Sequence, residues 1–272
     1  MTNYKITVLG GGRMGEALCL GVVKTEFAKL ENINVIEPLL DRADFLRKEH
    51  SLNVFSEYDD FIMDADILLV AVKPQIIDEV LASLKNYYNE EQIIISIAAG
   101  IPIARFLQNF GSNAKIIRVM PNTPCLIASG ASALCCSKET KENDMSLALE
   151  LFRSVGIVEE VPESLLDAVT GLSGSGPAYV FQFIEALSDA GVRVGLTREQ
   201  SLKLAAQTVY GSSKLLLETG EHPGKLKDMV TSPGGTTIAG LHALEKGGIR
   251  SSVIDAVIAA TNRSNELGKD SF

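Results

Sequence analysis

Short runs rich in isoleucine and valine alternate with amphipathic stretches over about the first 160 residues, and this alternation limits the possible folds more than any other feature. The runs are bounded by glycine, proline or aspartate, as buried strands are. They are ITVLG (6–10), NVIE (34–37), DILLVAV (66–72), IIISIA (93–98) and KIIRV (115–119), with ASALCC (131–136) and IVEEV (157–161) as further strands at the edge. Helical patterns such as EVLASLKNYY (79–88) separate the runs, which predicts a parallel sheet covered on both faces.

The strand signal stops near Pro162, and the remaining chain has helical patterns, among them 178–191 and about 249–267. Thr197 opens another helix with Gln200 three residues later, a capping-box pattern, and Gly220 suits its C-cap. The expected fold class is therefore α/β, with a Rossmann-type parallel-sheet domain over residues 1–161 and an all-helical domain over 162–272. Because this half is strongly apolar, we expect it to pack against a second copy of the chain, the alternative being a bundle packed only on itself.

Composition argues against several classes of protein. Hydrophobic residues make up 46% of the 272 residues, yet no stretch reaches the roughly 18 uncharged apolar residues of a membrane span. The N-terminus lacks a signal-peptide pattern and the four cysteines form no C-x-x-C pair, so we expect a cytoplasmic protein with free thiols. The formal charge of -9 disfavours nucleic acid and anionic membranes as partners, and three histidines without ligand spacing suggest no metal site.

A glycine-rich segment, Gly10-Gly11-Gly12-Arg13-Met14-Gly15, fits G-x-G-x-x-G between the first predicted strand and a predicted helix. Gly10 permits the tight turn, Gly12 lets the backbone approach a pyrophosphate, and Gly15 allows close helix–strand packing. The segment predicts a dinucleotide site, with a glycine turn that binds no ligand as the alternative.

Further cofactor contacts are expected at the carboxyl ends of later strands, where open parallel sheets bind ligands. The residues are Ala71, Val72, Lys73 and Pro74 at the end of the third run, Ala98, Ala99 and Gly100 at the end of the fourth, and Asn122 after the fifth. Each segment alone fits ordinary turn chemistry, but their repetition on one sheet edge favours a binding cleft.

In the helical half, Ser232-Pro233-Gly234-Gly235-Thr236-Thr237 precedes a predicted helix. The paired glycines free backbone N–H groups to bind an anion, and the threonines offer hydroxyls beside it. We expect a carboxylate-sized pocket here, and the alternative is a helix N-cap with a flexible lead-in. The sequence suggests no Ser-His-Asp or Cys-His arrangement, which favours hydride transfer because the cofactor then supplies the chemistry.

Two long segments, GLSGSGPAYVFQFIEALSDAGVRVGL (171–196) and EHPGKLKDMVTSPGGTTIAGLHALEKGGIRS (221–251), closely resemble the C-terminal signature of the pyrroline-5-carboxylate reductase family. GGGRMG, AVKP, SIAAG and VMPNTP resemble the family's N-terminal segments in the same order. The resemblance spans nearly the whole chain. It implies the last step of proline biosynthesis, in which a reduced nicotinamide delivers hydride to the C=N carbon of 1-pyrroline-5-carboxylate. It also implies a helical dimerisation domain with interlocked subunits and, in many members, a ring of dimers.

The resemblance also assigns residue roles. Ser232, Gly234, Gly235 and Thr236 match the carboxylate cradle, and Thr237 matches the threonine whose hydroxyl approaches the substrate nitrogen. Glu163 matches a glutamate near the substrate and the nicotinamide. The cofactor-contacting segments match Gly10 to Met14, Ala71 to Lys73 and Ala98 to Gly100.

The choice of cofactor stays open in the sequence. The family resemblance implies NADPH, but Glu37 ends the second predicted strand, where an acidic residue normally binds the ribose hydroxyls of NADH and repels a 2'-phosphate. Arg42 follows soon after and could reach such a phosphate. The alternatives to the reductase are an enzyme for another small imine or 2-oxo acid on the same fold, and a nucleotide-binding relative without catalysis.

Overall fold

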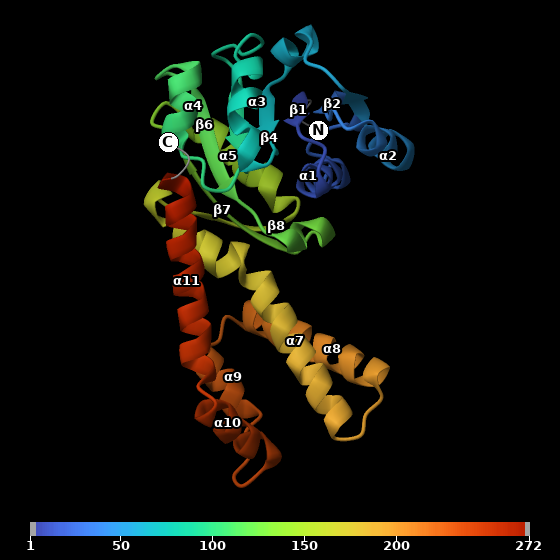
Figure 1. Cartoon of the computed structure of the whole chain (residues 1–272), viewed down its shortest axis with the longest axis vertical. Helices are drawn as coiled ribbons and strands as arrows, with labels where there is room; N and C mark the ends of the chain where they lie inside the picture. The colour runs from blue at the N-terminus through green and yellow to red at the C-terminus, as the bar shows by residue number, and fades with distance from the viewer. Residues whose placement is uncertain (1–3, 270–272) are drawn as a thin grey trace. The chain divides into compact units, whose positions relative to one another are not determined.

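The computed structural model describes residues 4–269 (Figure 1), and contacts between Cα atoms divide the chain into two compact units. The first unit holds residues 4–175 together with 259–269, and the second holds residues 176–258. Contacts therefore group residues 162–175 with the sheet, whereas the domain boundary expected from the sequence falls between residues 161 and 162.

The first unit is built on one eight-stranded sheet with the order β3-β2-β1-β4-β5-β6-β7-β8. The strands are β1 (Ile6–Leu9), β2 (Ile33–Ile36), β3 (Asn53–Phe55), β4 (Ile67–Val70), β5 (Ile93–Ser96), β6 (Lys115–Met120), β7 (Gly130–Cys136) and β8 (Gly156–Glu160). Strands β1 to β6 are all parallel, as predicted. The expected edge strands are present, but β7 runs antiparallel to β6 because only nine residues join them, too few for a crossover.

Strand β3 was not predicted from the sequence. It has three residues, of which only Val54 is buried, so it carries no apolar run. It nevertheless extends the sheet beyond β2 and places residues 56–58 beside the ends of the neighbouring strands.

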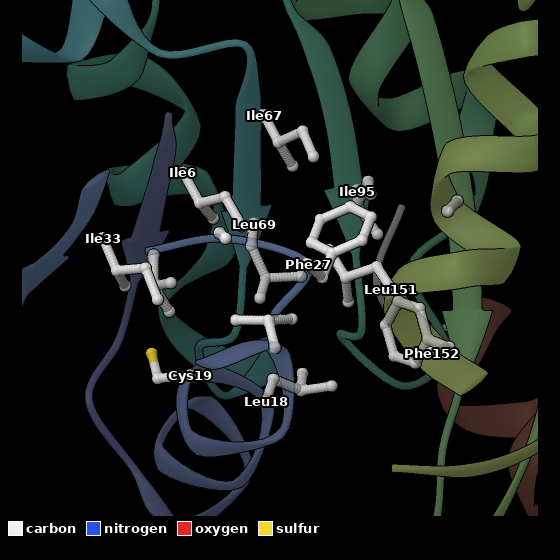
Figure 2. Packing of buried hydrophobic residues seen from close by; sticks show 14 of the residues in the cluster. Ile6, Leu18, Cys19, Phe27, Ile33, Ile67, Leu69, Ile95, Leu151 and Phe152 are labelled. Carbon is white, nitrogen blue, oxygen red and sulfur yellow. The ribbon is translucent and has the colours of Figure 1, made fainter. Parts of the chain in front are cut away.

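Helices cover both faces of the sheet. They are α1 (Arg13–Lys24), α2 (Leu40–His50), α3 (Ile77–Leu84), α4 (Ile103–Phe110), α5 (Glu142–Arg153) and α6 (Leu166–Val169), with short 3₁₀ turns at 30–32, 60–64, 74–76, 123–127 and 163–165. Alternate strand residues enter different cores: Ile67 and Leu69 pack with α1, α2 and α5, whereas Leu68 and Val70 pack with α3 and α4. Figure 2 shows the first core, in which Leu18 of α1 and Phe152 of α5 face the strands.

The second unit consists of helices alone. They are α7 (Gly176–Arg193), α8 (Arg198–Thr219), α9 (Pro223–Met229), α10 (Thr236–Lys246) and α11 (Ile249–Lys269), of which α11 continues into the first unit. The predicted capping box of Thr197 and Gln200 is confirmed, and Gly220 ends α8 in the left-handed conformation. Helices α7 and α8 lie side by side (Figure 1) and approach so closely that a Cβ on Gly191 would strike Ser201 Oγ.

The glycines of TGLSGSGP do not form a loop. Thr170–Gly174 is a π-helical turn between α6 and α7, in which the N–H of Ser175 donates to the carbonyl of Thr170 at 2.8 Å. The backbone N–H groups of this turn are therefore used in helical hydrogen bonds, unlike the N–H groups at the start of α10. A search of the described helices found none that combines the length and the apolar character needed to span a bilayer.

Candidate functional site

A pocket of about 780 Å³ opens at the carboxyl ends of the strands in the first unit. Gly10 follows β1 directly, Glu37 follows β2, Ser56 follows β3 and Ala71 follows β4, and all four line the pocket. The centre lies at β1, whose two neighbours are β2 and β4, so the chain turns to opposite sides of the sheet here. Such a switch point is where open α/β sheets bind nucleotides.

The three motif glycines differ in what a side chain would meet. Gly10 has φ +104°, and a Cβ there would come within 2.7 Å of the Ala71 carbonyl oxygen. A Cβ on Gly15 would strike the Gly10 carbonyl oxygen, whereas one on Gly12 would meet nothing within 4 Å. Gly12 is also the N-cap of α1 and makes no side-chain cap bond. The first turn of α1 thus presents bare backbone beside the pocket, as a pyrophosphate site requires.

Glu37 is held by backbone groups. Its Oε2 accepts the N–H of Gly11 at 3.0 Å, and its Oε1 accepts the N–H of Leu39 at 2.9 Å. Only 7% of the residue is exposed, although it lines the pocket. Each carboxylate oxygen retains a lone pair, so the group can still accept from a ribose hydroxyl.

Arg42 lines the same pocket, but its guanidinium is already engaged. Its Nε donates to the Gly11 carbonyl at 2.6 Å, and its Nη2 donates to Glu16 Oε2 at 2.5 Å. The second oxygen of Glu16 lies 2.7 Å from Nε2 of His50. His50 therefore belongs to a partly buried ion-pair group behind the glycine turn, although its charged sequence context suggests a surface position.

Lys73 and Pro74 begin the turn after β4, and Ala71, Val72 and Lys73 line the pocket together with Arg13. The remaining predicted residues of the turns, Gly11, Met14, Gly15 and Pro74, adjoin this lining.

Two sets of predicted cofactor-binding residues do not line this pocket. Ala98, Ala99 and Gly100 follow β5, and Asn122 bonds Ser173 O at 3.1 Å and Ala131 N at 2.9 Å. The amide of Asn122 therefore ties β6, β7 and the π-helical turn together.

Several pocket residues have no motif in the sequence. Ser56 and Tyr58 reach the pocket only because β3 extends the sheet, and Ile76 and Glu79 come from the turn and helix after β4. Burial raises the pKa of the Tyr58 hydroxyl, which keeps it protonated as a hydrogen-bond donor. Glu37 and Pro74 could be predicted because an acidic residue and a proline at strand ends are recognisable in sequence. The four residues named here belong to no such pattern.

Glu163 stands at the start of a 3₁₀ turn and is fixed by two bonds. Its Oε1 accepts from Ile103 N at 2.8 Å and from Nη1 of the buried Arg118 on β6 at 3.2 Å. Arg118 was not singled out in the sequence. Neighbouring Cys135 is no nucleophile, because burial and then the charge of Glu163 raise the pKa of its thiol to about 12.

The second unit carries the other predicted site. Gly234 has φ +67°, the N–H of Gly235 donates to Ser232 O at 3.1 Å, and Gly235 is the N-cap of α10 without a side-chain bond. The first N–H groups of α10 are thus available to an anion. Ser232 and Thr236 are exposed beside them, and Thr237 is half-buried.

A second pocket, of about 670 Å³, lies between α9 and α10. Gly234 and Gly235 line it with Lys227, Asp228 and His242, but Ser232, Thr236 and Thr237 do not. Among residues 4–269 there is no group of histidine, cysteine or carboxylate side chains with the geometry of a metal site.

Comparison with known proteins finds matches over nearly the whole chain. Residues 163–267 match the family described as pyrroline-5-carboxylate reductase dimerisation, and residues 5–100 match the family described as NADP oxidoreductase coenzyme F420-dependent. The pyrroline-5-carboxylate reductase of Methanosarcina acetivorans is 47% identical over 99% of this chain and 100% of its own.

Two solved structures are similar throughout. Plasmodium falciparum pyrroline carboxylate reductase with NADP bound is 38% identical, with a TM-score of 0.87 over 98% of this chain and 99% of its own. A pyrroline-5-carboxylate reductase from Coxiella burnetii is 35% identical, with a TM-score of 0.92 over the same shares.

Proposed function

This chain belongs to the pyrroline-5-carboxylate reductase family, and from that premise we propose how its residues reduce the C=N bond of 1-pyrroline-5-carboxylate to give L-proline, the last step of proline biosynthesis. The observation that carries the proposal is the start of α10. It combines an open helix N-terminus with the threonine pair that the family resemblance assigns to the substrate.

The substrate is a small anion with an imine nitrogen. Its carboxylate binds the open N–H groups of α10 from Thr236 onward, in the cradle formed by Ser232, Gly234 and Gly235, where the helix dipole favours negative charge. The hydroxyl of Thr237 bonds the ring nitrogen and fixes the orientation of the C=N bond. The family resemblance gives Glu163 a role near the substrate, and the Ile103 amide and Arg118 hold its carboxylate in a fixed orientation.

The pocket of the first unit fits a dinucleotide. The bare turn at Gly10, Gly11 and Gly12 holds the pyrophosphate with Arg13 and Met14, and Glu37 receives the ribose. Lys73 and the residues of 98–100 and 122 complete the cofactor contacts. When bound, a reduced nicotinamide would supply the hydride for the C=N carbon, and the π pair of that bond would pass to the nitrogen. A protonated imine accepts a hydride without an enzyme nucleophile, so positioning is the main task of the protein.

NADPH is the expected cofactor, in line with the NADP-bound relative, and Glu37 also makes NADH a substrate. The chain forms a homodimer through its helical domain, residues 162–272, and we propose that the dimers assemble further into a ring. We place the enzyme in the cytoplasm because its four cysteines are free thiols.

The decisive test mixes the purified protein with 1-pyrroline-5-carboxylate and NADPH or NADH. Cofactor oxidation should match proline formation. The absence of turnover with both cofactors would contradict the proposal. Turnover of another cyclic imine or a 2-oxo acid alone would assign the chain to a different substrate, and tight nucleotide binding without any turnover would mark a non-catalytic relative.

A further inference from the structure

Behind the glycine turn, three charged side chains form a connected group that we call the Glu16 cluster: Glu16 of α1 with Arg42 and His50 of α2. Both oxygens of Glu16 are occupied, one by Arg42 Nη2 and the other by His50 Nε2. All three side chains are at least three-quarters buried. The cluster is therefore a built feature rather than a chance surface pair, and it reaches the pocket through Arg42.

The cluster fixes the orientation of Arg42. Its Nε donates to the Gly11 carbonyl, and the Phe45 ring packs under the guanidinium at 5.0 Å. The N–H of the same Gly11 donates to Glu37, so Arg42 and Glu37 hold opposite ends of one residue. Within residues 4–269, Nη1 of Arg42 has no hydrogen-bond partner, and the side chain lines the pocket.

The charges beside the ribose site decide which nucleotide fits. Glu37 and Glu16 contribute two negative charges against the one positive charge of Arg42, which leaves a net charge of −1 while His50 is neutral. A 2'-phosphate carries nearly two further negative charges. Arg42 is the one cation of the cluster at the ribose, and Glu16 already neutralises it.

We propose that Glu16 is a specificity-determining positioning residue, which holds Arg42 against Gly11 and offsets its charge, and so weakens the binding of a 2'-phosphate without excluding it. The inference rests on the proposed function, because it takes the pocket beside Glu37 as the ribose site. His50 occupies the other oxygen of Glu16 and so helps to keep the carboxylate in place beside Arg42.

The groups that face His50 are few. Glu16 approaches from α1, and from its own helix come the Phe45 ring, edge-on at 5.6 Å, and Arg42, which shares the Glu16 carboxylate. Glu37 lies beyond the Gly11 peptide. Burial raises the pKa of Glu16, but the hydrogen bonds and charges of Arg42 and His50 outweigh it, so the net pKa is lowered and the carboxylate stays ionised.

The first test measures nucleotide binding without substrate, by calorimetry with 2',5'-ADP and 5'-AMP, which differ in the 2'-phosphate alone. In Glu16→Gln, the Kd of 2',5'-ADP should fall about tenfold, because one unit of opposing charge is worth about one pKa unit of interaction. The Kd of 5'-AMP should stay within about twofold. Glu139→Gln, an exposed site after β7 at the far side of the sheet, controls for net charge.

The second test keeps Glu16 and replaces its other partner. His50→Gln, whose amide can still donate to Glu16, leaves the carboxylate on Arg42, so the ratio of the Kd values of 2',5'-ADP and 5'-AMP should match that of the native protein. A ratio that changes as much as in Glu16→Gln would assign the effect to His50 instead and overturn the proposal.

Unchanged or weaker binding of 2',5'-ADP in Glu16→Gln, with 5'-AMP binding retained, overturns the proposal. If Glu16→Gln does not fold, Glu16→Asp replaces it, because the shorter side chain cannot hold Arg42 and His50 together, and an unchanged ratio of the two Kd values then overturns the proposal. The outcome is independent of the reductase assay: nucleotide discrimination without proline formation would leave the Glu16 cluster intact and remove only the proposed reaction.

Discussion

The two compact units bury their side chains to very different degrees. The sheet unit has two continuous cores, one on each face, with residues such as Leu68 and Phe106 fully buried. In the 83 residues of 176–258, only Ser188, Ser201 and Ala205 are buried. A unit with so small a core cannot offset the conformational entropy of its own folding. The sheet unit therefore has cores of its own, whereas the helical unit needs apolar contacts from a second copy, in line with its match to the family's dimerisation domain.

The exposed apolar residues of the helical unit indicate why it buries so few side chains within one copy of the chain. They include Phe181 at 65%, Tyr210 at 59% and Leu217 at 71%. Exposed apolar surface on this scale marks an interface, and these residues lie in the region matched by the family dimerisation domain. A dimer therefore supplies the hydrophobic core that the helices lack.

The largest effect is expected from a charged side chain placed in the exposed apolar surface of the helical unit, because it should prevent dimer formation. Phe181→Asp would place a carboxylate against the partner, at a desolvation cost of several kcal/mol in each copy. Sedimentation should then show a 29.2 kDa monomer at micromolar concentration, with activity lost. Met63→Asp, an equally drastic change at an exposed apolar residue of the sheet unit, should leave the dimer intact. If Phe181→Asp stays dimeric, the proposed difference between the two units is wrong.

Two glycine substitutions separate folding from binding inside the sheet unit. Gly15→Ala forces a Cβ against the Gly10 carbonyl and should lower the free energy of unfolding by about 3 kcal/mol. Gly12→Ala meets no protein atom and should leave the melting temperature nearly unchanged. Its methyl group would occupy the proposed pyrophosphate site, so the Kd of the cofactor should rise about tenfold. Thermal unfolding and a fluorescence titration with NADPH measure stability and cofactor binding in both variants. Equal melting temperatures for the two variants would contradict the prediction that a Cβ at Gly15 clashes with Gly10.

In the helical unit, Thr237→Ala should affect rate without affecting the fold. Gly235, not Thr237, is the N-cap of α10, so the helix keeps its start. Loss of one hydrogen bond to the reacting nitrogen should lower kcat about 10²-fold, and the cofactor Kd should hardly move. Steady-state kinetics measure the change in kcat, and circular dichroism shows whether the fold is retained. Full turnover would show that Thr237 only begins a helix.

The smallest effect concerns Glu37. Glu37→Ser removes a negative charge beside the ribose and should shift the ratio of kcat/KM values several-fold toward NADPH, less so at high salt. Because Glu37 also accepts the N–H groups of Gly11 and Leu39, the affinity for both cofactors should fall as well. An unchanged ratio at low salt would mean that Glu37 serves only the turn.

The sequence determined the local features of this protein. The isoleucine and valine runs, the spacing of Gly10, Gly12 and Gly15, and the capping box at Thr197 each depend on neighbouring residues, so their patterns predict strands, a turn and a helix start directly. The helical positions of α10 and α11 follow for the same reason. The family could be predicted because its signatures are contiguous segments.

The tertiary structure decided what depends on distant residues. Arg42 was expected to be able to reach a phosphate, yet it bonds Glu16, which lies 26 residues away in the chain and is adjacent only when α1 and α2 flank β1. The reversal of β7 and the role of Asn122 likewise depend on which strands meet. A hydrophobic pattern specifies that a side chain is buried, but the geometry of the fold selects which polar groups meet there, because hydrogen bonds and ion pairs act only at short range.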